Sequence, residues 1–292
     1  MSKKNRKPPW HQYFLIAMAI LLSLLMVVSR AYRASRRAGI AHSETPAVFE
    51  QAVSGVPDTE ERSEIYEPMY PLPEKLALLG HIDPVSDDGF TLIDRRYANR
   101  QGMYMRSEAY DAFLQMHKAA QSDGINLIIL SATRPFDHQK RIWEDKWFGR
   151  RVLYGNILAT DIDDLAERAR EILRFSAMPG TSRHHWGTDI DLNSLDNSYF
   201  ASGEGKAVYD WLIKNAAGFG FCQPYTAHGD NREGGYEEEK WHWSYQPISS
   251  VFLKAYEDKV DYGDITGFAG WEMASELDVI SRYVLDISLS CY

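Results

Sequence analysis

The spacing of apolar and polar residues along the chain predicts a mixture of helices and short strands. Apolar positions three and four apart predict helices over residues 107–120, 135–147, 160–175, 207–217 and 271–285. Short apolar or alternating segments, bounded by turn residues, predict strands over residues 125–130, 189–192 and 241–245. Helices and strands do not alternate regularly, so the pattern favours an α+β fold over a doubly wound sheet.

Cap and turn residues indicate where these elements begin and end. Thr160 and Asp163 have the spacing of a capping box and are expected to start the third helix. Gly218 and Gly220 are expected to end the fourth helix. Between that helix and the last strand lies a polar loop, residues 224–239, whose length indicates a functional role.

The amino terminus has a pattern of its own. Residues 13–28 are apolar and uncharged, with basic residues on both sides, which is typical of a secretion signal or a short membrane anchor. The arginines that follow occupy the region where a signal peptidase needs small residues, so we expect an uncleaved anchor. The sequence therefore divides into a basic amino terminus with this apolar segment (1–37), a polar linker (38–73) and a folded domain (74–292) that ends in a helical extension.

The charge of the chain is divided unevenly between these parts. The formal net charge is −9, but the first 42 residues contain eight basic and no acidic residues. The rest of the chain holds 24 basic against 41 acidic residues, a net charge of −17. A domain this acidic repels phosphate backbones, so we expect no nucleic-acid partner.

The sequence contains two cysteines, Cys222 and Cys291, and no C-x-x-C pair. A zinc site made of thiolates and a dithiol redox motif are therefore excluded. In an oxidising compartment the two cysteines could form a disulfide that fixes the C-terminal tail. Two unpaired thiols are an equal alternative, because spacing does not fix connectivity.

Two segments combine histidines with carboxylates. A turn with two histidines, His184 and His185, precedes the strand that contains Asp191, so one of these histidines and Asp191 can converge on one point. Glu239 and His242 supply a further carboxylate and imidazole; positions three apart on a regular strand face opposite sides, so Glu239 is expected in the loop or at a bulge. Two imidazoles and a carboxylate are good zinc ligands that leave one position for water, and a free carboxylate can take its proton. This is the minimum apparatus for metal-dependent amide hydrolysis.

A third segment, residues 131–139, places Arg134 where a predicted strand ends and a helix begins. Its fixed cation suits a substrate carboxylate or a developing oxyanion. The sequence contains no His-Glu-x-x-His, Gly-x-Ser-x-Gly, phosphate loop or dinucleotide fingerprint, so serine hydrolases and nucleotide enzymes have little support.

Taken in order, the three segments resemble the signature of the zinc D-alanyl-D-alanine carboxypeptidases of the VanY type. That family shares a fold with the VanX dipeptidases and the Hedgehog signalling domain. The residues that match its motifs are Ser131, Arg134 and Gln139, then Ser182, His184, Gly187 and Asp191, then Glu239 and His242. The resemblance covers about residues 103–245 and implies an antiparallel sheet with flanking helices.

The resemblance also implies a role for each matched residue. It implies one zinc ion bound by His184, Asp191 and His242, with Glu239 as general base and later proton donor. It further implies that Arg134 stabilises the oxyanion or holds the terminal carboxylate of the substrate. Ser182 would bind the end of the substrate, and Gln139 would bind substrate or shape the Arg134 pocket. One position departs from the family, since Asp189 stands where a small residue is usual. Asp189 lies on the same strand face as Asp191, so it either supports the ligands from behind or competes as a ligand.

The resemblance and the export segment together imply a membrane-anchored enzyme with its catalytic domain outside the cytoplasm, or a secreted one if the segment is cleaved. Its expected reaction is removal of the terminal D-alanine from peptidoglycan stem peptides. A D,D-dipeptidase or peptidoglycan endopeptidase with the same zinc site is an alternative, as is a non-catalytic, zinc-stabilised binding module. Glu239 and Arg134 favour an enzyme, because a structural zinc site needs neither. The sequence assigns no chemical role to residues 248–292.

Overall fold

The computed structural model describes residues 72–229 and 232–292, so the apolar segment 13–28 and nearly all of the predicted linker lie outside it. Its centre is a four-stranded antiparallel sheet in the order β3-β4-β6-β5. The strands are β3 (Ile129–Ser131), β4 (Asp189–Leu192), β5 (Phe221–Cys222) and β6 (His242–Tyr245). The predicted combination of helices with an antiparallel sheet is confirmed, and β4 has the predicted bounds.

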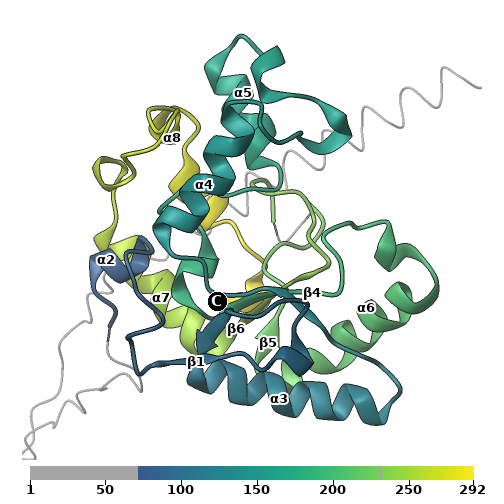
Figure 1. The fold of residues 1–292 in the computed structure, drawn as a ribbon. Coiled ribbons are helices and arrows are strands. Elements are labelled where there is room, and N and C mark those ends of the chain that lie inside the picture. The colour runs from purple at the N-terminus through teal and green to yellow at the C-terminus, as the bar shows by residue number, and fades with distance from the viewer. Residues whose placement is uncertain (1–71, 230–231) are drawn as a thin grey trace, which may run out of the picture. The chain divides into compact units, whose positions relative to one another are not determined.

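Helices cover this sheet, and a small hairpin precedes it. The helices are α2 (Lys75–Leu78), α3 (Ser107–Ser122), α4 (Phe136–Trp147), α5 (Leu165–Leu173), α6 (Gly203–Asn215), α7 (Gln246–Lys259) and α8 (Met273–Glu276), and the hairpin strands are β1 (Phe90–Leu92) and β2 (Tyr104–Arg106). Figure 1 shows the strands between α3 on one side and α4 on the other. Helix α3 forms because its apolar side chains recur every three or four residues, and those of Phe113, Met116 and Ala120 are fully buried.

Four predicted elements differ from the structure. Helix α6 begins at Gly203, four residues before the predicted start, and local hydrogen bonds explain the other three differences. The strand predicted over residues 125–130 is shorter, because Ile125 donates its N–H to Ala120 and so closes the end of α3. The helix predicted from Thr160 begins later, because the side chain of Asp164, and not Thr160, caps the N–H of Glu167 at 2.8 Å.

The helix predicted over residues 271–285 is also broken. Asp278 adopts a positive φ of 50° between α8 and a π-helical turn, Ile280–Val284. The Tyr262 hydroxyl donates to the side chain of Asp278 and accepts from the N–H of Ile280, a backbone group that a continuous helix would pair internally.

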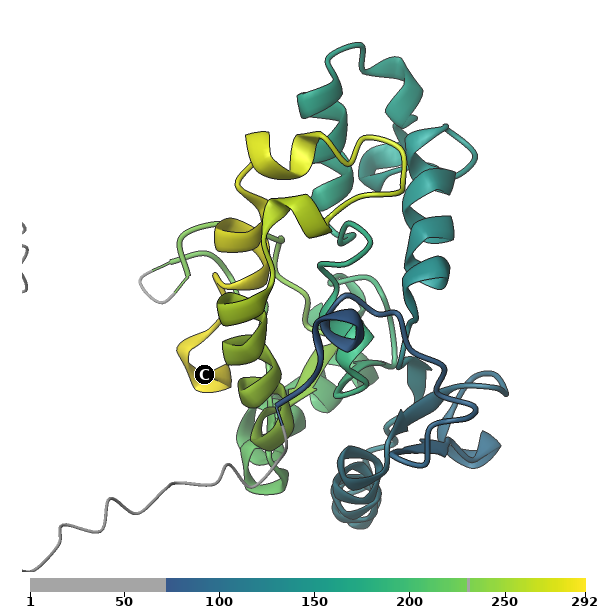
Figure 2. The ribbon, with the colours of Figure 1, turned by 90° about the vertical axis from the view of Figure 1, so that its left-hand side faces the viewer.

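The C-terminal residues, which had no predicted role, brace the polar loop 224–239. Residues 277–292 return alongside α7, as Figure 2 shows. Cys291 forms a disulfide with Cys222, which settles the alternative left open by the sequence. Ser288 donates its N–H to Pro224, and Asp286 accepts the N–H of Gly234.

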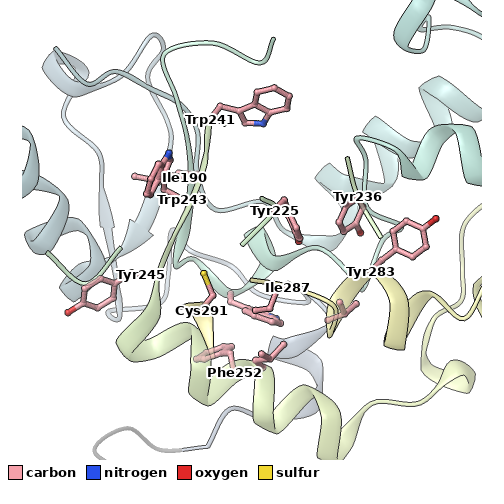
Figure 3. Packing of buried hydrophobic residues seen from close by; sticks show 14 of the residues in the cluster. Ile190, Tyr225, Tyr236, Trp241, Trp243, Tyr245, Phe252, Tyr283, Ile287 and Cys291 are labelled. Atoms are coloured by element: carbon pink, nitrogen blue, oxygen red, sulfur yellow. The ribbon is translucent and has the colours of Figure 1, made fainter. Parts of the chain in front are cut away.

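Aromatic packing reinforces this brace. Tyr225 and Tyr236 of the loop and Tyr283 of the C-terminal segment follow one another, with ring centres 4.8 and 5.1 Å apart (Figure 3). The buried Arg232 holds the loop from inside by donating to the carbonyls of Thr226, Gly234 and Tyr236. The loop is thus fixed at the point where it leads to β6.

In the described part of the chain, no helix has the length and apolar character that crossing a bilayer requires.

Candidate metal centre and catalytic cleft

Strand pairing brings the predicted ligands together. Asp191 on β4 lies directly opposite His242 on β6, and Asp189 lies opposite Ser244. Because side chains alternate along a strand, both pairs occupy one face of the sheet. The cross-strand register therefore creates a compact polar cluster inside the core.

His184 reaches this cluster from a 3₁₀ turn, Arg183–Trp186, that precedes β4. Its Nδ1 donates to the carbonyl of Ala132 at 2.8 Å, which leaves the Nε2 lone pair directed at the cluster. The turn ends at Gly187, whose φ is +74° and where a Cβ would lie 2.4 Å from the ring of Phe90. Only glycine fits there, and it sets the path from His184 into β4.

His184, Asp191 and His242 form a buried group that is suited to a metal ion. One ligand atom from each lies within 4.8 Å of the other two. His184 Nε2 and Asp191 Oδ1 are 3.3 Å apart, and neither atom has a hydrogen-bond partner among the described residues. Buried polar atoms normally have partners, so these two indicate a ligand, and two imidazoles with one carboxylate fit zinc.

His242 takes part through Nδ1, because its other ring nitrogen is occupied. Nδ1 lies 3.6 Å from Asp191 Oδ1 and 3.1 Å from Glu239 Oε2, whereas Nε2 donates to Asp189 at 2.9 Å. Although burial opposes the charged imidazole, the hydrogen bonds to Asp189 and Glu239 raise the pKa of His242 to about 9. A metal ion must displace that proton in order to bind Nδ1.

Asp189, the departure from the family pattern, holds the ligands from behind. Its carboxylate accepts hydrogen bonds from Arg183 Nε at 3.1 Å, Ser244 Oγ at 3.0 Å, Thr188 Oγ1 and His242 Nε2. Against the effect of burial, the Arg183 guanidinium and the His242 imidazole hold the pKa of Asp189 well below its usual value. With these donors in place, Asp189 orients His242 and is not a member of the metal-binding group.

Glu239 lies in the loop immediately before β6, as the strand argument required. Its N–H donates to Tyr225 at 2.9 Å, and its carbonyl accepts from Gln223 Nε2 at 3.1 Å. These bonds direct the carboxylate toward His242. Burial raises the pKa of Glu239, so this carboxyl group holds a proton more readily than an exposed glutamate.

Arg134 is fixed through its backbone by the histidine turn. Its N–H donates to the carbonyl of His184 at 3.0 Å, and its carbonyl accepts from His185 Nδ1 at 2.6 Å. Burial lowers the pKa of His185 to about 3, so this histidine is a neutral structural residue. The side chain of Arg134 lines the cleft, and its buried Nε has no partner among the described residues.

The site opens into a cleft of about 590 Å³. Asp191, Glu239 and Arg134 line it, together with one face of α4. On that face His138 and Lys146 stand eight residues apart, a spacing that the helix predicted over residues 135–147 already contained, although the sequence analysis did not select them.

Two residues expected to contact substrate do not line this cleft. Gln139 points into the core, is fully buried and donates to the carbonyl of Ala177 at 2.7 Å. Gln139 belongs to the buried stripe of α4, with Phe136, Trp143 and Trp147, and this packing explains the difference. Ser182 is buried, and its carbonyl accepts the N–H of His185 to begin the histidine turn. Ser182 thus begins the histidine turn and Gln139 ties α4 to Ala177, while their contact with substrate stays a prediction.

The residues of this site lie within a region that matches a known protein family. The family model of VanY, the D-alanyl-D-alanine carboxypeptidases, matches residues 102–248. The chain belongs to the VanY family. The matched VanY region contains Arg134, the three residues of the metal-binding group and Glu239.

Two relatives named as carboxypeptidases also match this VanY-family chain. A putative carboxypeptidase YodJ of Bacillus subtilis is 30% identical over 179 residues, which cover 59% of this chain and 57% of that protein. A D-alanyl-D-alanine carboxypeptidase of Enterococcus faecalis is 31% identical over 134 residues, covering 46% and 45%. The chain thus spans about half the length of these relatives.

Solved structures of VanY proteins are similar at a lower level. VanYB in complex with D-alanine-D-alanine is 23% identical with a TM-score of 0.43, covering 59% of this chain and 84% of that one. A mutant of the vancomycin resistance D,D-pentapeptidase VanY in complex with Zn(II) is 23% identical with a TM-score of 0.41, covering 63% and 93%.

Proposed function

We propose that the protein is a zinc-dependent D-alanyl-D-alanine carboxypeptidase that removes the terminal D-alanine from peptidoglycan stem peptides. The observation that carries this proposal is the buried His184, Asp191 and His242 group with the Glu239 carboxylate 3.1 Å from His242 Nδ1. Membership of the VanY family supports the substrate class and a Hedgehog/D,D-peptidase-like fold.

Different residues of the site would bind the metal ion, transfer the proton and bind the substrate anion. His184 Nε2, a carboxylate oxygen of Asp191 and His242 Nδ1 would hold zinc, which when bound polarises a carbonyl and acidifies water. Glu239 accepts the proton of the attacking water and returns it to the amine of the departing D-alanine. Arg134 presents an unpaired N–H to the terminal carboxylate or to the oxyanion.

The test uses the full-length, zinc-loaded protein and a stem pentapeptide ending in D-Ala-D-Ala, with products identified by mass spectrometry. We expect release of a single D-alanine, and loss of this activity in Glu239→Gln. Glu238→Gln is the matched control, because Glu238 faces Lys240 and does not line the cleft. Cleavage at an internal bond would replace the carboxypeptidase by an endopeptidase, and an uncut peptide on zinc-loaded protein would refute the proposal.

The apolar segment 13–28 indicates where in the cell this reaction takes place. We infer that residues 13–28 anchor the protein in the cell membrane with residues 74–292 outside the cytoplasm, where peptidoglycan is found. Protease added to intact spheroplasts should then degrade the folded domain. Protection of that domain until the membrane is lysed would refute this orientation.

A further inference from the structure

The cleft carries more positive charge than the proposed reaction uses. The cations that line it are Arg100, Arg134, Lys146 and Arg151. Three carboxylates face them, and two of these, Asp191 and Glu239, already serve the metal site and proton transfer. The whole chain has a formal net charge of −9, so this positive cleft is a local feature. Its charge favours an anionic substrate.

Lys146 is a partly buried cation of the cleft that has a hydrogen bond but no ion pair among the described residues. It lies in the last turn of α4 and donates to the Ser176 hydroxyl. Burial, with a smaller contribution from Arg151, lowers the pKa of Lys146 to about 8, so the amine is mainly protonated at neutral pH. Lys146 is partly buried, and the Glu239 carboxylate offsets only part of the effect of burial on its pKa, so a bound anion would further stabilise the charged amine.

Arg151 adds a second cation at the same end of the cleft. Its N–H donates to the carbonyl of Asp145 at 2.8 Å, which fixes the backbone beside the last turn of α4. The neighbouring Arg150 differs, because it pairs with the Asp145 carboxylate at 2.7 Å and does not line the cleft. Arg151 is exposed and its guanidinium forms no ion pair with the described residues.

The length of α4 sets the distance between the two ends of the cleft. Arg134 precedes the first turn and Lys146 lies in the last, about 15 Å further along the helix axis at 1.5 Å per residue. The long side chains of lysine and arginine shorten this span. An extended peptide covers about 7 to 11 Å in two to three residues, so a peptide held by Arg134 at its end reaches toward Lys146.

We propose that Lys146 and Arg151 form a subsite for a second carboxylate of the substrate, two or three residues before the terminal one. This inference rests on the proposed function and specifies its substrate. Two groups of a peptidoglycan stem have this chemistry: the free α-carboxylate of a γ-linked D-glutamate, and the second carboxylate of a diaminodicarboxylic acid at the third position. Aromatic rings of Tyr154, Phe175 and Trp241 enclose this end of the cleft, with successive ring centres 5.3 and 6.2 Å apart.

The test measures kcat/KM of the full-length, zinc-loaded protein on four pentapeptides ending in D-Ala-D-Ala. The peptides combine a free or amidated glutamate α-carboxylate with a diaminodicarboxylic acid or lysine at the third position. Removing the recognised carboxylate should lower kcat/KM at least about tenfold, and the position that matters identifies its source. In Lys146→Met and in Arg151→Gln the same removal should have a much smaller effect. Arg150→Gln is the charge-matched control and should behave as the parent protein.

The results distinguish failure of the proposed carboxylate subsite from failure of the proposed carboxypeptidase reaction. Equal kcat/KM on all four peptides would overturn the subsite and leave the carboxypeptidase intact. Arg151 is exposed, so its variant keeps the test valid if Lys146→Met does not fold. If no peptide is cleaved, the proposed reaction fails, and calorimetric binding of the same peptides to Glu239→Gln decides the subsite. Binding that does not depend on the second carboxylate would then overturn it.

Discussion

Replacing Asp189 by asparagine removes one negative charge from the most enclosed part of the site while keeping the volume of the side chain. Asp189 is the partner of the buried Arg183 and the acceptor that fixes the ring of His242. The substitution therefore tests two separate effects, one through the contact of Asp189 with Arg183 and one through its contact with His242. We expect a loss of folding stability through Arg183 and a loss of metal affinity through His242.

The size of the expected loss in folding stability follows from the burial of the Arg183 and Asp189 side chains. The side chains of Arg183 and Asp189 are both 0% exposed, and removing one partner of such a pair costs about 3 to 5 kcal/mol. Asparagine still accepts one hydrogen bond, so we expect about 3 kcal/mol. The Arg150 and Asp145 pair is the matched control, because its side chains are 56% and 48% exposed. Asp145→Asn should cost at most about 1 kcal/mol.

Urea unfolding of the zinc-free protein measures the first effect, and competition with a chelator measures zinc affinity. Loss of the carboxylate that orients a metal-binding histidine should weaken zinc binding about 10- to 100-fold in Asp189→Asn and leave it unchanged in Asp145→Asn. Equal destabilisation by the two substitutions would refute the argument from the buried pair. Unchanged zinc affinity in Asp189→Asn would show that Asp189 does not orient His242.

Three further predictions concern other parts of the site. Arg134→Gln should lower kcat/KM about 100-fold or more without loss of bound zinc, as steady-state kinetics and metal analysis would show. Charged His242 stabilises the zinc-free protein below its unfolded pKa of about 6.5, and this contribution is lost as pH rises through about 9. The melting temperature of zinc-free protein should therefore fall between these pH values, and His242→Gln should lack this fall. Replacing Cys222 and Cys291, 69 residues apart, by serine should destabilise the protein by about 4 kcal/mol in urea unfolding, while an unchanged midpoint would show that the cross-link is unimportant.

The segments that carry the metal-binding group could be found from the sequence, whereas the choice of His184 over His185 rested on the resemblance to the family. The spacing from His184 through a glycine turn to Asp191 specifies a turn followed by a strand, and β4 has the predicted bounds. The prediction that Glu239 lies in a loop followed from the side-chain alternation of β6 and is confirmed. The catalytic roles of these residues are still predictions that the experiments above decide.

Other features depend on contacts between distant segments, which spacing does not encode. The function of Asp189 was left open because it depends on Arg183 and on the register that places Ser244 opposite. Helix α7 was missed, although Pro247 in its first turn and apolar residues at helical spacing signal it. Gln139 could not be assigned to the core face of α4 without knowing which side of that helix the cleft occupies.

The bracing of the polar loop by the C-terminal segment bears on where a domain boundary should be drawn. The family match ends at residue 248, and a fragment cut there retains every motif residue. It loses the partners of Pro224 and Gly234 and the sulfur that joins Cys222. Sequence similarity thus covers the residues of the site, whereas the contacts that hold the polar loop in place extend to Cys291.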